Sequence, residues 1–405
     1  MKRICKPLIC VLLTLVMLLS FSGCSILGLF NALVLPENNA DLATEETKDL
    51  TYQEKLDEVV SLLDQVYVDG YNTEELGDYL ASAAVAATGD RWSYYISAKE
   101  FDAYVESNNN AYVGIGVTIE VRDGVKGYTI TDLTPNGPAD TGGIEIGDVL
   151  VAVDGQDVTE MDTTQTKDLV RGVAGSTVAI TVERDGERKT FEVVRALVET
   201  EVVSYELLDN AIGYIKINNF DANCARDTLA AIEDLLAQDA QGLVFDLRFN
   251  PGGRKSELLE VLDYLLPEGP LFRSVDYTGK ESVDTSDADC LEMPMAVIVN
   301  DDSYSAAEFF AAALQEYEWA TVVGTQTCGK GNYQQTFRLS DGSAIAVSTG
   351  HYQTPNGVTL TDIGVTPDVV VEVDEETYRA IYSGKLSHAD DTQLQAAVDA
   401  VLKAE

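Results

Sequence analysis

One short segment constrains the fold more than any other part of the chain. The uninterrupted apolar run Met295–Val299 predicts a buried strand. Asn300–Ser303 then supplies residues that favour a turn. From Ser305 onward, apolar residues recur at 306, 309, 310, 313, 314 and 317, which is the spacing of an amphipathic helix. Ser305 is therefore predicted to lie where a core strand turns sharply into a helix.

Strands and helices alternate in the same way from about residue 200 onward. Core strands are predicted at 212–217, 243–247 and 296–299, and helices near 224–237, 255–266 and 305–317. This alternation predicts an α/β core. The sequence contains no phosphate-binding loop, dinucleotide fingerprint or internal repeat.

Lys330 is the candidate base for a Ser305 nucleophile. It lies between two glycines and is followed by Gln334. The chain has only two histidines, His351 and His388, and the hydrolase pattern G-x-S-x-G is absent around Ser305. A lysine base needs a pKa about three units below its usual value of about 10.4, and burial can supply that shift. We therefore expect Lys330 to be screened from water and from carboxylates.

Each of these residues also has a simpler interpretation. Ser305 and Glu308 match a capping box, in which the two side chains satisfy the first backbone amides of a helix. A lysine between glycines is often a solvated loop charge. The catalytic interpretation depends on the larger ordered pattern around them.

That pattern resembles the carboxy-terminal processing (tail-specific) serine peptidases. The resemblance rests on motifs that occur in the family's order between about residues 50 and 372: 89–95, 246–253, 297–308, 329–334, 354–357 and 364–368. It implies Ser305 as nucleophile, Lys330 as general base and Gln334 as the residue that orients the lysine. It also implies an oxyanion hole built from the amides of Gly252 and Ala306, with no cofactor.

Three positions depart from the family pattern. Phe249 stands where a small or polar residue is common, Arg254-Lys255 where apolar residues are usual, and Cys328 where an aromatic residue is common. None of them removes a catalytic group, so they bear on substrate preference rather than on the chemistry.

A second resemblance covers residues 111–196, where short alternating strands and glycine pairs are similar to a PDZ domain. Gly114, Ile115, Gly116 and Val117 would form its carboxylate-binding loop, and a peptide would add beside the adjoining strand. The simpler alternative is a strand pair with a glycine bulge. Arg171 matches a basic position of the family's PDZ domains and is a candidate ligand sensor, although an exposed arginine is more often only solvated.

The N-terminus predicts export and lipidation. Lys2, Arg3 and Lys6 precede an apolar stretch over 8–19, which is too short to span a membrane comfortably and fits a signal peptide. Ser-Gly before Cys24 resembles a bacterial lipoprotein cleavage site, which implies residues 1–23 as signal peptide and 24–50 as tether. The alternative is an ordinary signal peptide with an incidental cysteine.

The remaining parts are helical. Capping boxes at Thr51 and Ser97 and a periodic segment over 73–87 predict a helical region over 51–110, which could pack against the protease or pair two chains as a homodimer. The protease core is expected over 197–373 and a helical tail over 374–405. The complete chain is thus predicted to be a multidomain α/β protein.

The net charge and the cysteine content argue against nucleic acid, anionic lipid and metal ions as binding partners. The net charge is −41, and removal of three basic residues with the signal peptide makes it about −44, which disfavours nucleic acid and anionic lipid as partners. A preference for basic substrates is a weaker inference. Three cysteines remain after Cys24 at unrelated spacings, and no cluster suggests a metal site. Cys328 is expected to be a buried core residue.

Together these features predict a lipid-anchored serine endopeptidase on the extracytoplasmic face of a bacterial membrane. It would cleave proteins near exposed C-terminal tails under the control of its PDZ domain. One alternative is an inactive scaffold of the same fold that only binds tails. Another is a carbohydrate or polyester hydrolase, which would need a histidine base.

Overall fold

The computed structural model describes residues 48–404, so the predicted signal peptide, Cys24 and most of the predicted tether lie outside the described residues. The chain divides after Asn72 into two compact units. The first contains helix α3 (Tyr52–Val66), which begins at the predicted capping box of Thr51 and Glu54. Within the described residues, no helix is both long enough and apolar enough to cross a membrane.

The second unit begins with two helices and one strand. Helices α4 (Thr73–Ala86) and α5 (Ala98–Asn108) lie where the sequence predicts them, and Ser97 starts α5 with a capping box. Strand β1 (Tyr94–Ile96), between these helices, was not predicted. Its partner is a strand 250 residues further along the chain, which no local pattern can indicate.

The predicted PDZ domain is a small antiparallel sheet in the order β3-β4-β5-β7-β8, with β6 on β5. Its elements are β3 (Val117–Glu120), β4 (Tyr128–Leu133), α6 (Pro138–Thr141), β5 (Val149–Val153), β6 (Gln156–Asp157), α7 (Thr163–Val170), β7 (Thr177–Arg184) and β8 (Glu187–Val194). Ile115, Ile130 and Ile180 are among its buried core residues. A separate two-stranded ribbon, β2 (Ala111–Gly114) with β9 (Ala196–Glu199), connects the domain to the rest of the chain.

The predicted protease core is built on a six-stranded sheet in the order β10-β11-β12-β15-β16-β19. Its strands are β10 (Val203–Leu207), β11 (Ile212–Ile217), β12 (Gly242–Asp246), β15 (Met295–Val299), β16 (Ala320–Gly324) and β19 (Val369–Val370). Strand β10 pairs antiparallel with β11, and the other pairs are parallel. Strands β12 and β15 are buried throughout, as expected for parallel strands covered on both faces.

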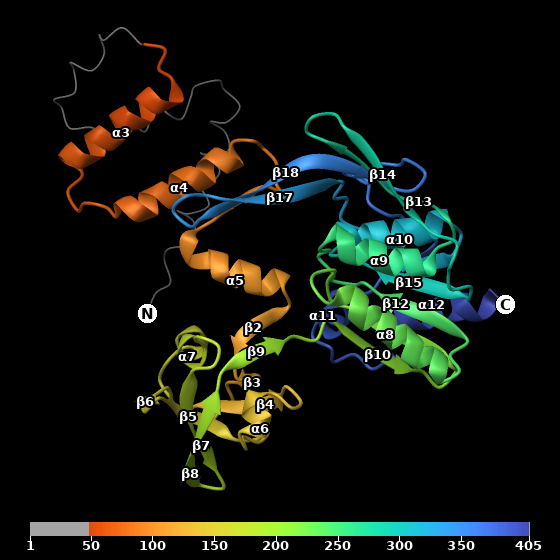
Figure 1. Ribbon diagram of the computed structural model, residues 1–405, viewed down its shortest axis with the longest axis horizontal. Coiled ribbons are helices and arrows are strands. Elements are labelled where there is room, and N and C mark those ends of the chain that lie inside the picture. The colour runs from red at the N-terminus through yellow and green to blue at the C-terminus, as the bar shows by residue number, and fades with distance from the viewer. Residues whose placement is uncertain (1–47, 405) are drawn as a thin grey trace, which may run out of the picture. The chain divides into compact units, whose positions relative to one another are not determined.

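Helices cover both faces of this sheet (Figure 1). Alternate residues such as Phe245 and Val297 face α8 (Cys224–Ala237), α9 (Lys255–Leu265) and α10 (Ala306–Glu316). Their neighbours Val244 and Ala296 face α12 (Thr392–Lys403) on the other side. The fold is therefore the predicted α/β class, and the predicted C-terminal tail supplies one of its layers.

A buried ion network fixes α12 to the sheet. The Arg248 guanidinium lies 2.6 Å from the Asp246 carboxylate and 2.8 Å from that of Asp391, the residue that caps α12. Arg248 also donates a hydrogen bond to Gln393 at 3.1 Å. Phe249 packs edge-on against Tyr378 and Tyr382 of α11 (Glu375–Tyr382). This departure from the family pattern therefore serves packing of the C-terminal helices.

A second, antiparallel sheet was missed by the sequence analysis. It has the order β1-β18-β13-β14, with β17 also paired to β18. The strands are β13 (Gly269–Asp276), β14 (Glu281–Ser286), β17 (Asn332–Arg338) and β18 (Ala344–Gln353). Most of them are only partly buried, so their apolar pattern is weak. This sheet carries the segment that follows Lys330.

Candidate active site

Ser305 lies at the turn between β15 and α10, as predicted. Its backbone has φ 59° and ψ −119°, a conformation that costs a non-glycine residue on the order of 1–3 kcal/mol. Ser303 stabilises the turn, because its Oγ donates to the Leu247 carbonyl oxygen at 2.7 Å and accepts from the Asn300 N–H at 3.0 Å. A serine on a strained strand-to-helix turn is typical of a hydrolase nucleophile. Here the conformation occurs without the G-x-S-x-G pattern.

The two predicted oxyanion donors lie next to Ser305 but differ in their hydrogen bonding. The Ala306 N–H, at the start of α10, has no hydrogen-bond partner in the described part of the protein. The Gly252 N–H donates to the Asn250 Oδ1 at 2.8 Å. Gly252 has φ 87°, and a Cβ there would lie 2.7 Å from the Ser305 Cβ. Only glycine lets this loop approach the serine so closely.

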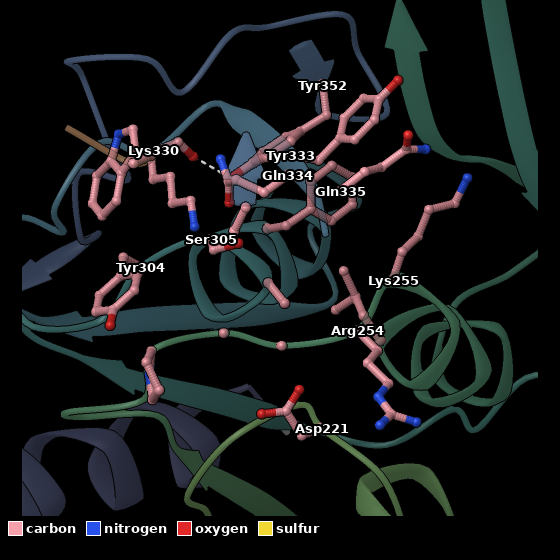
Figure 2. A pocket seen from close by; sticks show the side chains of 18 of the residues that line it. Asp221, Arg254, Lys255, Tyr304, Ser305, Lys330, Tyr333, Gln334, Gln335 and Tyr352 are labelled. Atoms are coloured by element: carbon pink, nitrogen blue, oxygen red, sulfur yellow. Dashed lines mark hydrogen bonds between the residues drawn. The ribbon is translucent and has the colours of Figure 1, made fainter. Parts of the chain in front are cut away.

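Lys330 enters the same cleft from the segment before β17 (Figure 2). Its Nζ lies 4.8 Å from the centre of the Trp92 ring and 5.8 Å from that of Tyr304. Burial lowers the pKa of Lys330 to about 8, although the nearby charges of Asp90 and Glu308 act to raise it. The expected screening from carboxylates is therefore incomplete, and loss of hydration outweighs them.

Glu308 links the Ser305 turn to the Lys330 loop. Its side chain is fully buried, and its Oε2 accepts the Ser305 N–H at 3.0 Å and the Lys330 N–H at 2.9 Å. Its Oε1 accepts the Gly329 N–H at 2.6 Å and the Thr327 hydroxyl at 2.5 Å. The predicted capping box is present, but the same carboxylate also holds two distant segments in register. The sequence analysis recognised only the first of these roles.

Gln334 lines the cleft on β17. Its amide nitrogen donates to the Asn332 carbonyl oxygen at 3.2 Å and to the Ser348 Oγ at 3.0 Å. Neither bond goes to the Lys330 amine. The structure thus brings Gln334 into the site without a direct hydrogen bond to the lysine.

Residues 90–93 are site components to which the sequence analysis assigned no role. Trp92 covers Lys330, and Asp90 is the nearby carboxylate with the largest effect on the lysine pKa. Asp90 accepts from the Ser93 hydroxyl at 2.5 Å, and that hydroxyl accepts the Ser348 N–H at 3.0 Å. The only signal was the family motif over 89–95, which says nothing about which strand the segment joins.

The candidate residues share one cleft of about 970 Å³. Ser305, Lys330, Gln334, Gly252 and Ala306 all line it, as do Asp221, Arg254, Lys255 and several aromatic residues. His351 is not among the lining residues and is exposed, with its Nδ1 2.7 Å from the Asn332 Oδ1. The site therefore does not favour a histidine base.

The predicted peptide-binding residues lie in the PDZ domain and do not line the cleft. Gly114 ends β2, Ile115 is buried, Gly116 has φ 74°, and Val117 begins β3. Strand β3 is at the edge of its sheet, where a peptide strand can be added. Arg171 lies 2.5 Å from the Glu106 carboxylate of α5 and 4.8 Å from the centre of the Tyr112 ring.

The three cysteines within the described residues are not paired with one another. Cys224, Cys290 and Cys328 are free thiols, and within residues 48–404 no cluster of side chains suitable for a metal ion occurs. Cys328 is only half-buried, with its Sγ 3.7 Å from the Arg91 guanidinium. The expectation of a core position for Cys328 was therefore wrong, because the loop before Lys330 lies at the surface of the core.

Comparisons with known proteins identify the family. Residues 211–371 match peptidase family S41, and residues 129–184 match the PDZ domain family. The carboxy-terminal-processing protease of Bartonella bacilliformis is 31% identical over 296 residues, which are 70% of this chain and 67% of that protein. The carboxyl-terminal-processing protease of a Picosynechococcus species is 31% identical over 322 residues, which are 78% and 76% of the two chains.

The chain belongs to the carboxy-terminal-processing proteases of peptidase family S41. A solved S41 protease structure from Bacteroides fragilis has the same fold, with a TM-score of 0.51 and 18% identity over 89% of this chain and 99% of that one. The predicted combination of a PDZ domain with an S41 core is confirmed. As a member of a protease family, the protein acts on protein substrates.

Proposed function

We propose that this family member is a serine endopeptidase that cleaves proteins near their C-termini, with Ser305 as nucleophile and Lys330 as general base. One observation carries the proposal: a serine on a strained strand-to-helix turn shares its cleft with a lysine whose pKa burial lowers to about 8. With that pKa, about a tenth of the lysine is uncharged at pH 7, enough to act as a base.

The chemistry follows that of Ser-Lys hydrolases. The neutral Lys330 amine accepts the Ser305 hydroxyl proton as the oxygen attacks the scissile carbonyl carbon. The resulting ammonium donates this proton to the leaving amine, and water then hydrolyses the acyl-enzyme with Lys330 again as base. The Ala306 N–H stabilises the oxyanion, helped by the positive end of the α10 dipole. Gly252 becomes the second donor once its N–H leaves Asn250.

A peptide assay tests this mechanism. Ser305→Ala should abolish cleavage of an internally quenched peptide, whereas Ser107→Ala, which removes another serine hydroxyl from the same cleft, should retain it. Mass spectrometry of trapped acyl-enzyme should place the adduct on Ser305. Equal activity in Ser305→Ala and the unmodified protein would refute the proposal and support a different chemistry.

We also propose that the PDZ loop over 114–117 binds the substrate's C-terminal carboxylate through backbone amides. The edge position of β3 and the positive φ of Gly116 support this role. Amidation of a peptide's C-terminus removes its charge without altering the scissile bond, and cleavage should then slow. Gly116→Glu should slow it likewise. Equal rates for the free acid and the amide would contradict tail binding.

Cys24 is proposed to carry the lipid that holds the enzyme on the extracytoplasmic face of the membrane. The support is the sequence alone: a basic start, an apolar stretch and Ser-Gly-Cys directly after it. Cys24→Ala should release the protein from the membrane fraction or block its processing. Unchanged membrane retention and processing in Cys24→Ala would contradict the lipid anchor.

A further inference from the structure

Asp221 is a cleft carboxylate without a partner. It lies in the turn between β11 and α8, is half-buried, and lines the same cleft as Ser305. Its backbone is fully engaged, since its N–H donates to the Asn219 Oδ1 at 2.9 Å and its carbonyl oxygen accepts from the Cys224 N–H. Among the residues that the structure describes, none forms a hydrogen bond or ion pair with its carboxylate.

The turn that contains Asp221 packs beside the glycine pair that approaches Ser305. A Cβ on Gly253 would lie 2.6 Å from the Asp221 nitrogen, and one on the preceding Gly252 would lie 2.7 Å from the Ser305 Cβ. The Asp221 backbone therefore lies against Gly253, beside the close approach of Gly252 to Ser305, and Figure 2 shows Asp221 and Lys330 on different sides of Ser305. Because an extended peptide advances about 3.3 Å per residue, we expect a carboxylate in this cleft to face a substrate residue within about three positions of the scissile bond.

The neighbouring cations are held elsewhere. The Arg254 guanidinium donates to the Asn108 carbonyl oxygen at 2.6 Å and to the Asn109 Oδ1 at 2.7 Å. Lys255 is paired with Asp284 at 2.5 Å. Figure 2 shows the side chains of Arg254 and Lys255 leaving their turn in opposite directions. Neither cation forms an ion pair with Asp221 within the described residues.

The energetics of Asp221 favour a cationic ligand. Burial raises the pKa of Asp221 to about 6, in spite of the nearby Arg254 charge. Above that pH the carboxylate is ionised in a partly dehydrated place, which is unfavourable unless an opposite charge pairs with it. Tyr94 and Tyr104 also line the cleft and can cover the aliphatic stem of a long basic side chain. The net charge of −41 attracts basic segments in general.

We propose that Asp221 is a specificity-determining residue that binds a lysine or arginine side chain of the substrate beside the scissile bond. This inference rests on the proposed peptidase function. It identifies the preferred substrates as proteins with a basic residue near the cleavage site. The supporting arrangement is the cleft that Asp221 lines together with Gly252, Gly253 and Ser305.

The proposal can be tested on the whole protein with a series of peptides in which one residue is varied at successive positions around the cleaved bond. Lysine, its neutral isostere norleucine, or glutamate is placed at each of the three positions on either side of the cleaved bond. At one position the lysine peptide should have a kcat/KM about tenfold above that of the norleucine peptide. Asp221→Asn should bring this ratio close to one, mainly by lowering kcat/KM for the lysine peptide. Asp209→Asn, an equal charge change at an exposed site, should not alter the ratio.

Two further variants make the outcome decisive. Arg254→Leu removes the nearby positive charge that lowers the pKa of Asp221 and should increase the lysine preference, and Asp221→Lys should reverse that preference in favour of glutamate. A ratio near one in the unmodified enzyme, or a ratio unchanged in Asp221→Asn, overturns the proposal. Failure of the proposed peptidase function looks different, because no peptide would then be cleaved faster than by Ser305→Ala.

Discussion

The protease core and the PDZ domain hold their functional residues in different ways. In the core, a fully buried carboxylate, that of Glu308, binds both the Ser305 and the Lys330 backbone. In the PDZ domain, the loop over 114–117 follows a two-stranded ribbon, and Arg171 reaches α5 through a single, partly exposed ion pair. Buried charged hydrogen bonds are stronger than exposed ion pairs, so the catalytic geometry is expected to be stiffer than the PDZ position.

This difference between the two regions predicts that variants in each will impair peptide cleavage in a distinct way. A change at Ser305, Lys330 or the Glu308 carboxylate that holds their backbones should affect the cleavage of every peptide, because it alters the proposed reacting groups or their geometry. A change in the PDZ domain or its ribbon should affect only peptides that carry a free C-terminal tail. Comparing free-acid with amidated peptides for each variant therefore shows which region it has altered.

The largest effect is expected from Lys330. Lys330→Ala should lower kcat by about a thousandfold or more with free-acid and amidated peptides alike, because Ser305 loses its proposed base. In the unmodified enzyme, kcat/KM should rise about tenfold per pH unit until it levels near pH 8, as the lysine loses its proton. Full activity in Lys330→Ala with loss in His351→Ala would contradict the Ser-Lys pair.

Glu308 should give the next largest effect. Glu308→Gln replaces one of two acceptor oxygens by a donor, although four groups donate to this side chain. We expect kcat to fall by about 10- to 100-fold for all peptides, with a lower melting temperature. Because the Glu308 charge raises the pKa of Lys330, the midpoint of the pH profile should also move to lower pH. A profile that keeps its midpoint would show that the charge does not act on the lysine.

The smallest effect is expected where the PDZ domain meets α5. Glu106→Gln weakens the ion pair with Arg171, and such an exposed pair contributes about 0.2–1 kcal/mol. Cleavage of amidated peptides should change by less than about twofold, while the ratio of free-acid to amidated rates changes by about two- to fivefold. A similar loss for both peptides would place Glu106 in the core mechanism and remove the distinction between the regions.

Local patterns were sufficient for most individual elements. The buried strand before Ser305, the helix after it and the capping boxes at Thr51 and Ser97 all lie where the sequence predicts them. Apolar periodicity and helix capping involve residues only a few positions apart, so they can be recognised from the sequence without knowledge of the fold. The same is true of the glycines that flank Lys330, for which the sequence analysis identified a site of close packing.

Long-range pairing and burial were decided only by the tertiary structure. No local pattern shows that β1 pairs with β18, that Trp92 covers Lys330, or that Glu308 reaches the Lys330 loop. From the sequence we inferred that Lys330 must be dehydrated to act as a base. The dehydration itself comes from the packing of residues from distant segments. The unpaired state of Asp221 likewise depends on where Arg254 and Lys255 find their partners. The sequence determines which chemical groups are present. Their burial and charged neighbours, which set their pKa values and pairing, are determined only by the folded protein.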